Sequence, residues 1–319
     1  MALIELDRAS KSFTVRTRAG RLRRQRRQVV AVDQVSFTIE AGAMVGYIGP
    51  NGAGKSTTIK MLIGILVPSG GRVTIAGMDP ARRRVAVARR IGVVFGQRTQ
   101  LWWDLPLCDS FDLLRHVYRV PARHHAAMLD TFVDLLDLAP FLTTPVRQLS
   151  LGQRMRGELA AALLHEPPVV LLDEPTIGLD LVSKEAVRKF LVELNRDTGT
   201  TVLLTTHDLA DVERLCRRLL IIDHGRVIED TTVAGIKERY GDTRTLVVDL
   251  ADPGDTVEVP GTELVRSEGP RRWLRFDRER HTAASVLAAV TRDTVVRDIA
   301  LEEPSIEEIV GRIYRGERP

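Results

Sequence analysis

The segment Gly49–Thr57 reads G-P-N-G-A-G-K-S-T and fits the pattern G-x-x-x-x-G-K-[ST] at every required position. A short apolar run, Met44–Ile48, precedes it, and apolar residues follow at helical spacing from Thr58 to Leu66. A strand, a glycine-rich loop and a helix in this order form a cradle for phosphate, because exposed N–H groups and the helix N-terminus attract anions. Lys55 is expected to reach the outer phosphates and Ser56 to bind Mg²⁺. The sequence therefore predicts a phosphate-binding α/β core.

The composition limits the class of protein. The 319 residues are 44% hydrophobic and 28% charged, which is enough for one large domain and a smaller one. No apolar run approaches the roughly 18 residues of a membrane-spanning helix, and the N-terminal residues lack the pattern of a signal peptide. The chain is expected to stay in the cytosol. Its cysteines, Cys108 and Cys216, have neither metal-site spacing nor the density of a disulfide-rich protein, so redox chemistry is not indicated.

Two stretches near the N-terminus, residues 2–9 and 29–39, alternate apolar and polar side chains and predict half-buried antiparallel strands. Residues 16–27 between them form a basic insertion with almost no apolar side chains. Its seven arginines are Arg16, Arg18, Arg21, Arg23, Arg24, Arg26 and Arg27. So many guanidinium groups cannot be buried without partners. The insertion is therefore either a solvated loop or a surface that contacts anionic lipid headgroups or a partner protein.

Polar residues follow three strand-like segments, at positions where open α/β sheets bind ligands. These are Gln97 after residues 91–95, Asp173 and Glu174 after residues 169–172, and His207 after residues 201–206. Asp173 is expected to hold Mg²⁺, and Glu174 is placed to polarise a water for attack on phosphorus. As isolated residues, Gln97 and His207 would give little reason to expect a functional role. Their positions at the ends of strands strengthen the case for such a role.

Two further regions complete the expected organisation. Helical patterns from Cys108 to about Leu138, and after the natural N-cap Ser150, predict a helical subdomain at about residues 101–165 inside the α/β core. From about residue 241 the pattern changes to a small α+β domain with no recognisable catalytic cluster. We therefore expect a first domain at residues 1–240 and an accessory domain at 241–319.

Taken together, the phosphate loop, Gln97, L-S-L-G-Q, V-V-L-L-D-E, G-L-D and His207 resemble the ATP-binding cassette (ABC) ATPases over about residues 2–230. The resemblance implies an α/β fold: a P-loop NTPase core with an antiparallel β subdomain and an inserted helical subdomain, followed here by the small α+β domain. It implies an ATPase that uses ATP and Mg²⁺. One departure is Leu151, where glycine is usual; a side chain there is tolerable if it points away from the nucleotide.

The same resemblance assigns roles to individual residues. Phe13 would stack on adenine, Glu174 would be the general base, and His207 would sense the γ-phosphate. Asp180 would relay between subunits, while Ser150 and Gly152 would act on the ATP of the opposite subunit. The nucleotide-binding candidates are Phe13, Gly49, Asn51, Gly52, Ala53, Gly54, Lys55, Ser56, Thr57, Ser150, Gly152, Gln153 and Asp180. The metal candidates are Ser56, Gln97 and Asp173, and the catalytic candidates are Lys55, Gln97, Glu174 and His207.

Three local features resemble the ATPases of bacterial drug-export systems of the daunorubicin-resistance and viologen-exporter kind. They are the basic insertion after Phe13, F-G-Q-R-T-Q-L-W-W-D-L-P, and Q-R-M-R-G-E-L-A-A-A-L-L-H with L-D-E-P-T-I-G-L-D. This resemblance implies a homodimer around two ATP that drives a separately encoded membrane permease at the cytoplasmic face of the plasma membrane. The cargo would be a drug-like or lipid-like compound. Trp102 and Trp103 are predicted either to line the groove that receives the permease or to be core residues of the helical subdomain.

Two other classes of function remain open at this point. One is the ATPase of an importer, whose C-terminal domain would often be regulatory; the local drug-export features argue against it. A soluble cassette protein acting on ribosomes or DNA would use the arginines for nucleic-acid contacts. Such proteins usually carry two cassettes or a long coiled coil, whereas this chain has one cassette and neither, so no nucleic-acid partner is expected.

Overall fold

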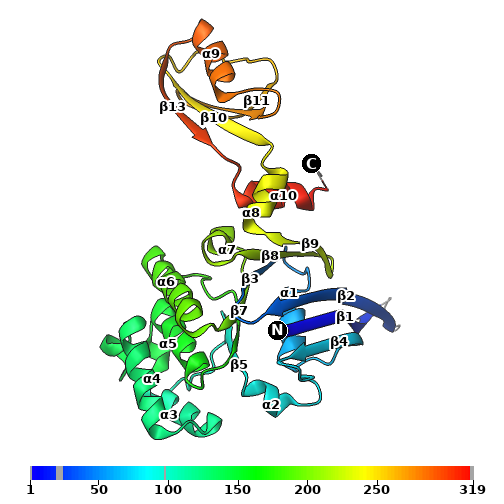
Figure 1. Ribbon diagram of the computed structural model, residues 1–319, viewed down its shortest axis with the longest axis vertical. Helices are drawn as coiled ribbons and strands as arrows, with labels where there is room; N and C mark the ends of the chain where they lie inside the picture. Colours follow the sequence, from blue (N-terminus) through cyan, green and yellow to red (C-terminus); the bar gives the residue numbers. More distant parts are fainter. Residues whose placement is uncertain (1, 19–23, 97, 317–319) are drawn as a thin grey trace. The chain divides into compact units, whose positions relative to one another are not determined.

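The computed structural model describes residues 2–18, 24–96 and 98–316 (Figure 1). Three candidate residues, Gln97, Arg21 and Arg23, lie outside the described residues, and for 16–18, 24 and 25 only the backbone is described. The chain divides into two compact units, Met1–Thr231 and Thr232–Pro319. Each unit has a hydrophobic core of its own.

A six-stranded sheet with the strand order β5-β6-β7-β3-β8-β9 forms the centre of the first unit. Its strands are β3 (Met44–Ile48), β5 (Ile91–Phe95), β6 (Val169–Asp173), β7 (Thr201–Thr205), β8 (Arg218–Asp223) and β9 (Arg226–Thr232). Neighbours from β5 to β8 run parallel. The interior strands are apolar runs buried along most of their length, as parallel strands covered on both faces are. Their carboxyl ends therefore meet at one edge of the sheet.

A three-stranded antiparallel sheet with the order β2-β1-β4 faces the other side of helix α1 (Lys55–Leu62) (Figure 1). Its strands are β1 (Ala2–Arg18), β2 (Arg24–Glu40) and β4 (Gly70–Ile75). Ile4, Ile39 and Ile75 point from these strands into the shared core and are fully buried. Because α1 packs between the two sheets, its N-terminus and the preceding phosphate loop are held from both sides.

Strands β1 and β2 are longer than the sequence pattern indicated. Residues 16–18 and 24–27 of the basic insertion continue the antiparallel pairing, with Arg16 opposite Arg26 and Val15 opposite Arg27. The arms of the insertion are therefore strands and not an irregular loop. The β-branched and aromatic residues around them, among them Phe13, Val15 and Val29, favour extended backbone even where they are exposed.

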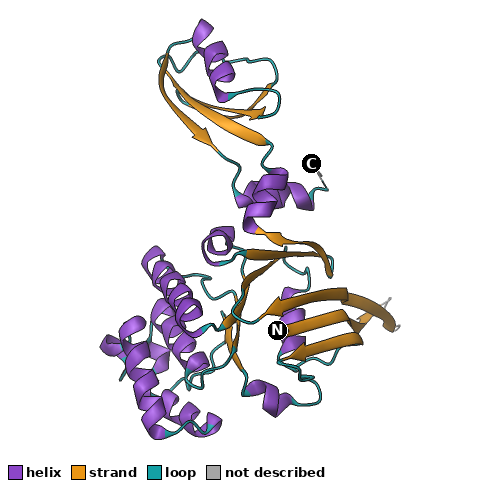
Figure 2. Cartoon of the chain, in the orientation of Figure 1, coloured by secondary structure: helices purple, strands orange, loops and turns teal. Residues whose placement is uncertain are grey.

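Helices cover the face of the central sheet away from the antiparallel sheet (Figure 2). They include α3 (Leu107–Tyr118), α4 (Ala122–Leu135), α5 (Leu151–Leu163), α6 (Leu181–Thr198) and α7 (Leu209–Leu215); α2 (Arg84–Ala88) precedes β5. The pattern that reads as helical from Cys108 to Leu138 is interrupted: Arg119 has a φ of 59° and Pro121 precedes α4. Proline disfavours helical backbone in the residue before it, which explains the break. Within the described ranges, no helix combines the length and apolar character needed to cross a membrane.

The second unit contains a four-stranded antiparallel sheet with the order β11-β12-β10-β13. Its elements are α8 (Val233–Tyr240), β10 (Thr243–Leu250), β11 (Thr262–Glu268), β12 (Arg271–Asp277), α9 (Ala283–Asp293), β13 (Val296–Glu302) and α10 (Ile306–Tyr314). Thr282 and Ser305 form capping boxes that begin α9 and α10. Val286 and Val290 of α9 pack on the apolar face of the sheet and complete a small core.

Candidate nucleotide-binding site

The phosphate loop connects β3 to α1, and its glycines are required by backbone geometry. Gly54 has a φ of 109°, and a Cβ there would lie 2.5 Å from the Ala31 carbonyl oxygen. A Cβ at Gly49 would lie 2.4 Å from the Ile222 carbonyl oxygen. Neither position accepts a larger side chain. Because no side chain caps α1, its first N–H groups stay available to an anion.

One cavity of about 840 Å³ brings most of the candidate residues together. Parallel strands deliver the lining residues from one sheet edge: the loop after β3, the residues that end β5 and β6, and the histidine after β7. The lining candidates are Asn51, Gly52, Gly54, Lys55, Ser56, Thr57, Asp173, Glu174 and His207. Hydroxyl, carboxylate, ammonium and backbone N–H groups thus converge on one volume, which is the donor set that a magnesium-bound polyphosphate needs.

The two carboxylates are oriented by residues of the neighbouring strand. The Thr205 hydroxyl donates to Asp173 Oδ1 over 2.6 Å, and Glu174 N donates to the Thr205 carbonyl over 2.9 Å. His207 Nδ1 lies 2.5 Å from Glu174 Oε2. Glu174 also has a φ of 58°, a left-handed conformation that costs a non-glycine residue on the order of 1 kcal/mol or more. The surrounding contacts therefore hold Glu174 in a strained position, as is common at functional sites.

Lys55 folds back on its own loop. Its Nζ donates to the carbonyl oxygens of Gly49 and Pro50, at 2.5 and 3.2 Å. Burial lowers the pKa of this ammonium, and the nearby charges of Glu174 and Asp173 oppose that shift. The lysine is therefore held by weak carbonyl partners that a phosphate oxygen can replace.

Ser150 and Gln153 do not line this cavity but cap the N-terminus of α5. Gln153 N donates to Ser150 Oγ over 3.2 Å, and Ser150 N donates to Gln153 Oε1 over 2.9 Å. Gly152 allows close packing, since a Cβ there would lie 2.4 Å from Ser183 Oγ. The side chain of Leu151 packs toward Gly178 of the same chain, where a Cβ would lie 2.9 Å from Leu151 Cδ2. The departure at Leu151 therefore fills space within its own chain.

Other candidates also lie outside the cavity. Asp180 caps α6 by accepting from Ser183 N over 2.9 Å and from Ser183 Oγ over 2.7 Å. Phe13 is 37% exposed on β1, and Lys11 Nζ lies 5.4 Å from the centroid of its ring. Gly49 and Ala53 support the loop without lining the cavity, and Gln97 lies outside the described residues.

The cavity also contains residues that the sequence pattern did not single out. They are Ala31, Lys60, Ile65, Phe95, Gly96, Arg98 and Ile177. Arg98 is the most informative, because it adds a guanidinium group to a cavity whose other cations are lysine ammonium groups. Its position directly after Gln97 at a strand end was the available signal.

Known proteins resemble this chain over most of its length. A family model described as ABC transporter matches residues 32–177. The daunorubicin resistance ATP-binding protein DrrA3 of Streptomyces coeruleorubidus is 34% identical over 284 residues, covering 88% of this chain and 89% of the relative. The methionine import ATP-binding protein MetN of Geobacillus kaustophilus is 34% identical over 236 residues, covering 72% of this chain and 69% of the relative. A solved ATP-binding cassette, dimeric with ADP and phosphate, matches with 26% identity and a TM-score of 0.62 over 72% of this chain and 98% of its own.

Proposed function

This chain belongs to the ATP-binding proteins of ABC transporters, and on that premise we propose that it is the ATPase subunit of an exporter with a separate permease. ATP binding and hydrolysis, and the ABC ATPase fold predicted from the sequence, are confirmed by the family and by the solved cassettes. The similarity to DrrA3 supports export, because it extends over 284 residues and thus beyond the 236 matched to the methionine importer. The cargo would be a drug-like or lipid-like compound.

In the proposed site, the chain's own groups hold the nucleotide. Lys55 and the N–H groups of residues 52–56 would bind the phosphates. Ser56, Asp173 and Gln97 would hold Mg²⁺, which supplies charge neutralisation at the phosphates. The hydroxyl and carboxylate of Ser56 and Asp173, which face the same cavity, fit that ion. We expect Mg²⁺ to take its remaining ligands from phosphate and water.

Glu174 is the proposed general base. Its carboxylate lies at the end of β6 beside the phosphate loop, and the contact with His207 limits its rotation. A fixed carboxylate can accept a proton from a water aimed at the terminal phosphate. His207 would orient Glu174 and contact the same phosphate. Catalysis would then rest on positioning and electrostatics rather than on a covalent intermediate.

The helix caps outside the cavity support a dimeric site. Ser150, Gly152 and Gln153 begin α5, and Asp180 begins α6, yet none of them lines the cavity of its own chain. The positive dipole end of α5 suits an anion. We propose that two identical copies pair so that these residues complete the partner's ATP site. The solved relative with ADP and phosphate is itself a dimer.

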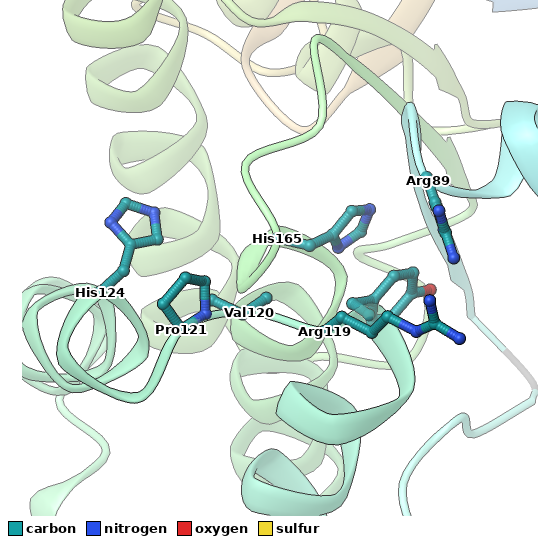
Figure 3. Close-up of a pocket in the computed structure, with 7 residues that line it drawn as sticks. Arg89, Arg119, Val120, Pro121, His124 and His165 are labelled. Atoms are coloured by element: carbon teal, nitrogen blue, oxygen red, sulfur yellow. The ribbon is translucent and has the colours of Figure 1, made fainter.

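A second cavity, of about 220 Å³, is the proposed permease-facing feature (Figure 3). It is lined by Arg89, by Arg119 and Pro121 between α3 and α4, and by His165 after α5.

Trp102 and Trp103, in the segment before α3, are 39% and 49% exposed, so neither is a core residue. Exposed aromatic and arginine side chains are typical anchors of protein interfaces. By binding the permease, the subunit would be held at the cytoplasmic face of the plasma membrane.

Transport direction tests the proposal. The chain would be co-expressed with its candidate permease, and inside-out vesicles would be supplied with Mg-ATP. We expect accumulation of the cargo inside those vesicles, and none with the Glu174→Gln subunit. Import remains the second candidate because of the similarity to the methionine importer. ATP-driven loss from inside-out vesicles, or uptake only by right-side-out vesicles loaded with ATP, would establish import instead.

A further inference from the structure

Arg98 enters the nucleotide cavity on its carboxylate side. Phe95, the last residue of β5, pairs with Asp173 of β6, and Gly96 N donates to the Asp173 carbonyl over 2.8 Å. The chain then turns, with Arg98 N donating to the Phe95 carbonyl over 3.3 Å. Since β5 is the direct neighbour of β6, Arg98 and Glu174 follow adjacent strands, and both line the cavity together with His207. Strands β6 and β7 separate β5 from β3, which leads into the phosphate loop.

The guanidinium of Arg98 is available for a ligand. It is exposed and forms no ion pair with any residue of the described ranges. The carboxylates nearest along the sheet edge already have partners, because Glu174 contacts His207 and Asp173 accepts from Thr205. A guanidinium stays charged at any relevant pH, and its fork of N–H donors matches phosphate oxygens. An unpaired cation in a cavity for a polyanion is a binding group for that anion.

The segment after Arg98 is fastened to α5 by Glu158. This side chain is 3% exposed, and its carboxylate accepts hydrogen bonds from the Thr99 hydroxyl and, over 3.2 Å, from Gln100 N. Gln100 Nε2 also donates to the Glu158 carbonyl over 3.3 Å. A buried carboxylate is costly without such partners. The two residues that follow Arg98 are therefore fixed to the helix whose N-terminus carries Ser150.

We propose that Arg98 contacts the outermost phosphate of ATP and that Glu158, acting through Thr99 and Gln100, positions it. The proposal rests on the ATP site described above and adds two residues to it. Its consequence is selectivity: Arg98 would favour a nucleoside triphosphate over a diphosphate, because only the triphosphate has the outermost phosphate that Arg98 is proposed to contact. Glu158 is a positioning residue that does not touch the nucleotide.

Equilibrium binding of ATP and ADP to the purified chain tests the role of Arg98. Arg98→Gln is expected to weaken ATP binding about tenfold, the usual scale of a charged hydrogen bond, and to change ADP binding less than about twofold. Arg98→Lys should fall between. Arg90→Gln is the matched control, because Arg90 is also exposed but precedes β5 at its other end and does not line the cavity. Equal losses for ATP and ADP, or no loss for either, would overturn the assignment. A wild-type chain that binds neither nucleotide would refute the proposed function itself.

A double-mutant cycle tests the positioning role. Thr99→Val replaces the hydroxyl by a methyl group and so removes its hydrogen bonds with Glu158 and Leu101 N. It is expected to lower the ATP-to-ADP affinity ratio about threefold when Arg98 is present, and not in the Arg98→Gln background. Glu158→Gln keeps the shape, and its amide oxygen can accept from Gln100 N while its amide nitrogen donates to the Thr99 hydroxyl oxygen, so this variant should retain the ratio of the wild type. Glu158→Leu should lose it, again only with Arg98 present. If Thr99→Val and Glu158→Leu act equally in both backgrounds, or lower only the melting temperature, the residues serve the fold and not Arg98.

Discussion

The two cavities of the first unit lie at opposite ends of β5 and differ in chemistry. At the carboxyl end, Phe95, Gly96 and Arg98 line the larger cavity with Glu174 and His207. At the amino end, Arg89 lines the smaller cavity, and His165 Nε2 lies 3.0 Å from the Ile91 carbonyl oxygen. The carboxyl end collects acid–base groups, whereas the amino end collects cations and rings without a carboxylate among its lining residues.

His165 makes the contrast sharper. Its ring stacks on Tyr118 with centroids 3.9 Å apart, and burial lowers its pKa to about 4. The imidazole is therefore neutral at physiological pH and unsuited to exchanging protons there. A rigid, neutral stack beside two guanidinium groups is suited to recognition. One strand therefore connects a cavity that carries acid–base groups to a cavity lined by cations and rings.

The largest effect is expected at the larger cavity, at the carboxyl end of β5. Glu174→Gln should lower ATP hydrolysis at least about a hundredfold while Mg-ATP still binds, because the amide keeps the shape and loses the base. The variant should accumulate an ATP-held dimer, measured by phosphate release and light scattering. A monomeric Glu174→Gln chain that hydrolyses ATP at the wild-type rate would remove Glu174 from its proposed role.

A smaller but still large loss is expected at the α5 cap. Ser150→Arg should reduce hydrolysis at least about tenfold through steric and charge conflict in the dimer, and should spare ATP binding to the monomer. Lys55→Ala is the comparison, because it removes a group inside the chain's own cavity. If Ser150→Arg weakens ATP binding to monomers as strongly as Lys55→Ala does, the assignment of Ser150 to the partner's site is wrong.

At the smaller cavity, the double variant Arg89→Gln, Arg119→Gln should weaken binding to the reconstituted permease by about tenfold. The ATPase rate of the isolated subunit should stay within about twofold. Arg123→Gln is the control, since Arg123 is exposed on α4 and does not line the smaller cavity. Equal permease binding by the double variant and the control would show that this cavity is not the docking surface.

The stacked histidine predicts a pH effect on folding. Because the folded pKa of about 4 lies below the unfolded value near 6.5, folding stability from the neutral ring is complete above pH 6.5 and is lost as the pH falls toward 4. Between pH 7.5 and 5.5 the loss should be about 1 kcal/mol, measured by urea unfolding at both values. His165→Phe keeps the stack and should lose less over this range; an equal loss would contradict the buried, neutral assignment.

The smallest effect concerns the basic insertion, of which no described residue lines either cavity. We predict that Arg26→Gln with Arg27→Gln weakens binding to anionic liposomes a few-fold at low salt, since each arginine near such a surface contributes about 1 kcal/mol or less. Both side chains are exposed on β2. Mg-ATP affinity should not change. If the double variant and the wild type bind anionic liposomes equally at every salt concentration, the insertion is better explained as a solvated segment.

The sequence alone predicts the parts of this protein that depend on local backbone geometry. The glycines of the phosphate loop, Gly49 and Gly54, can be predicted because no other residue fits there. The helix cap at Ser150 can be predicted because its partner lies within one helical turn. The break at Arg119–Pro121 is also local, and proline was its available signal. The extent of the β1–β2 hairpin was not readable, since exposed arginines give no apolar alternation.

What only the tertiary structure decided is which distant side chains meet. The order β5-β6-β7-β3 differs from the order of the strands in the sequence, and it alone brings Arg98 into one cavity with Glu174 and His207. The contact of Glu158 with Thr99, and the stack of His165 on Tyr118, likewise join segments separated by whole helices. Local propensity acts over a few residues, whereas strand order and burial are settled by the packing of the whole core.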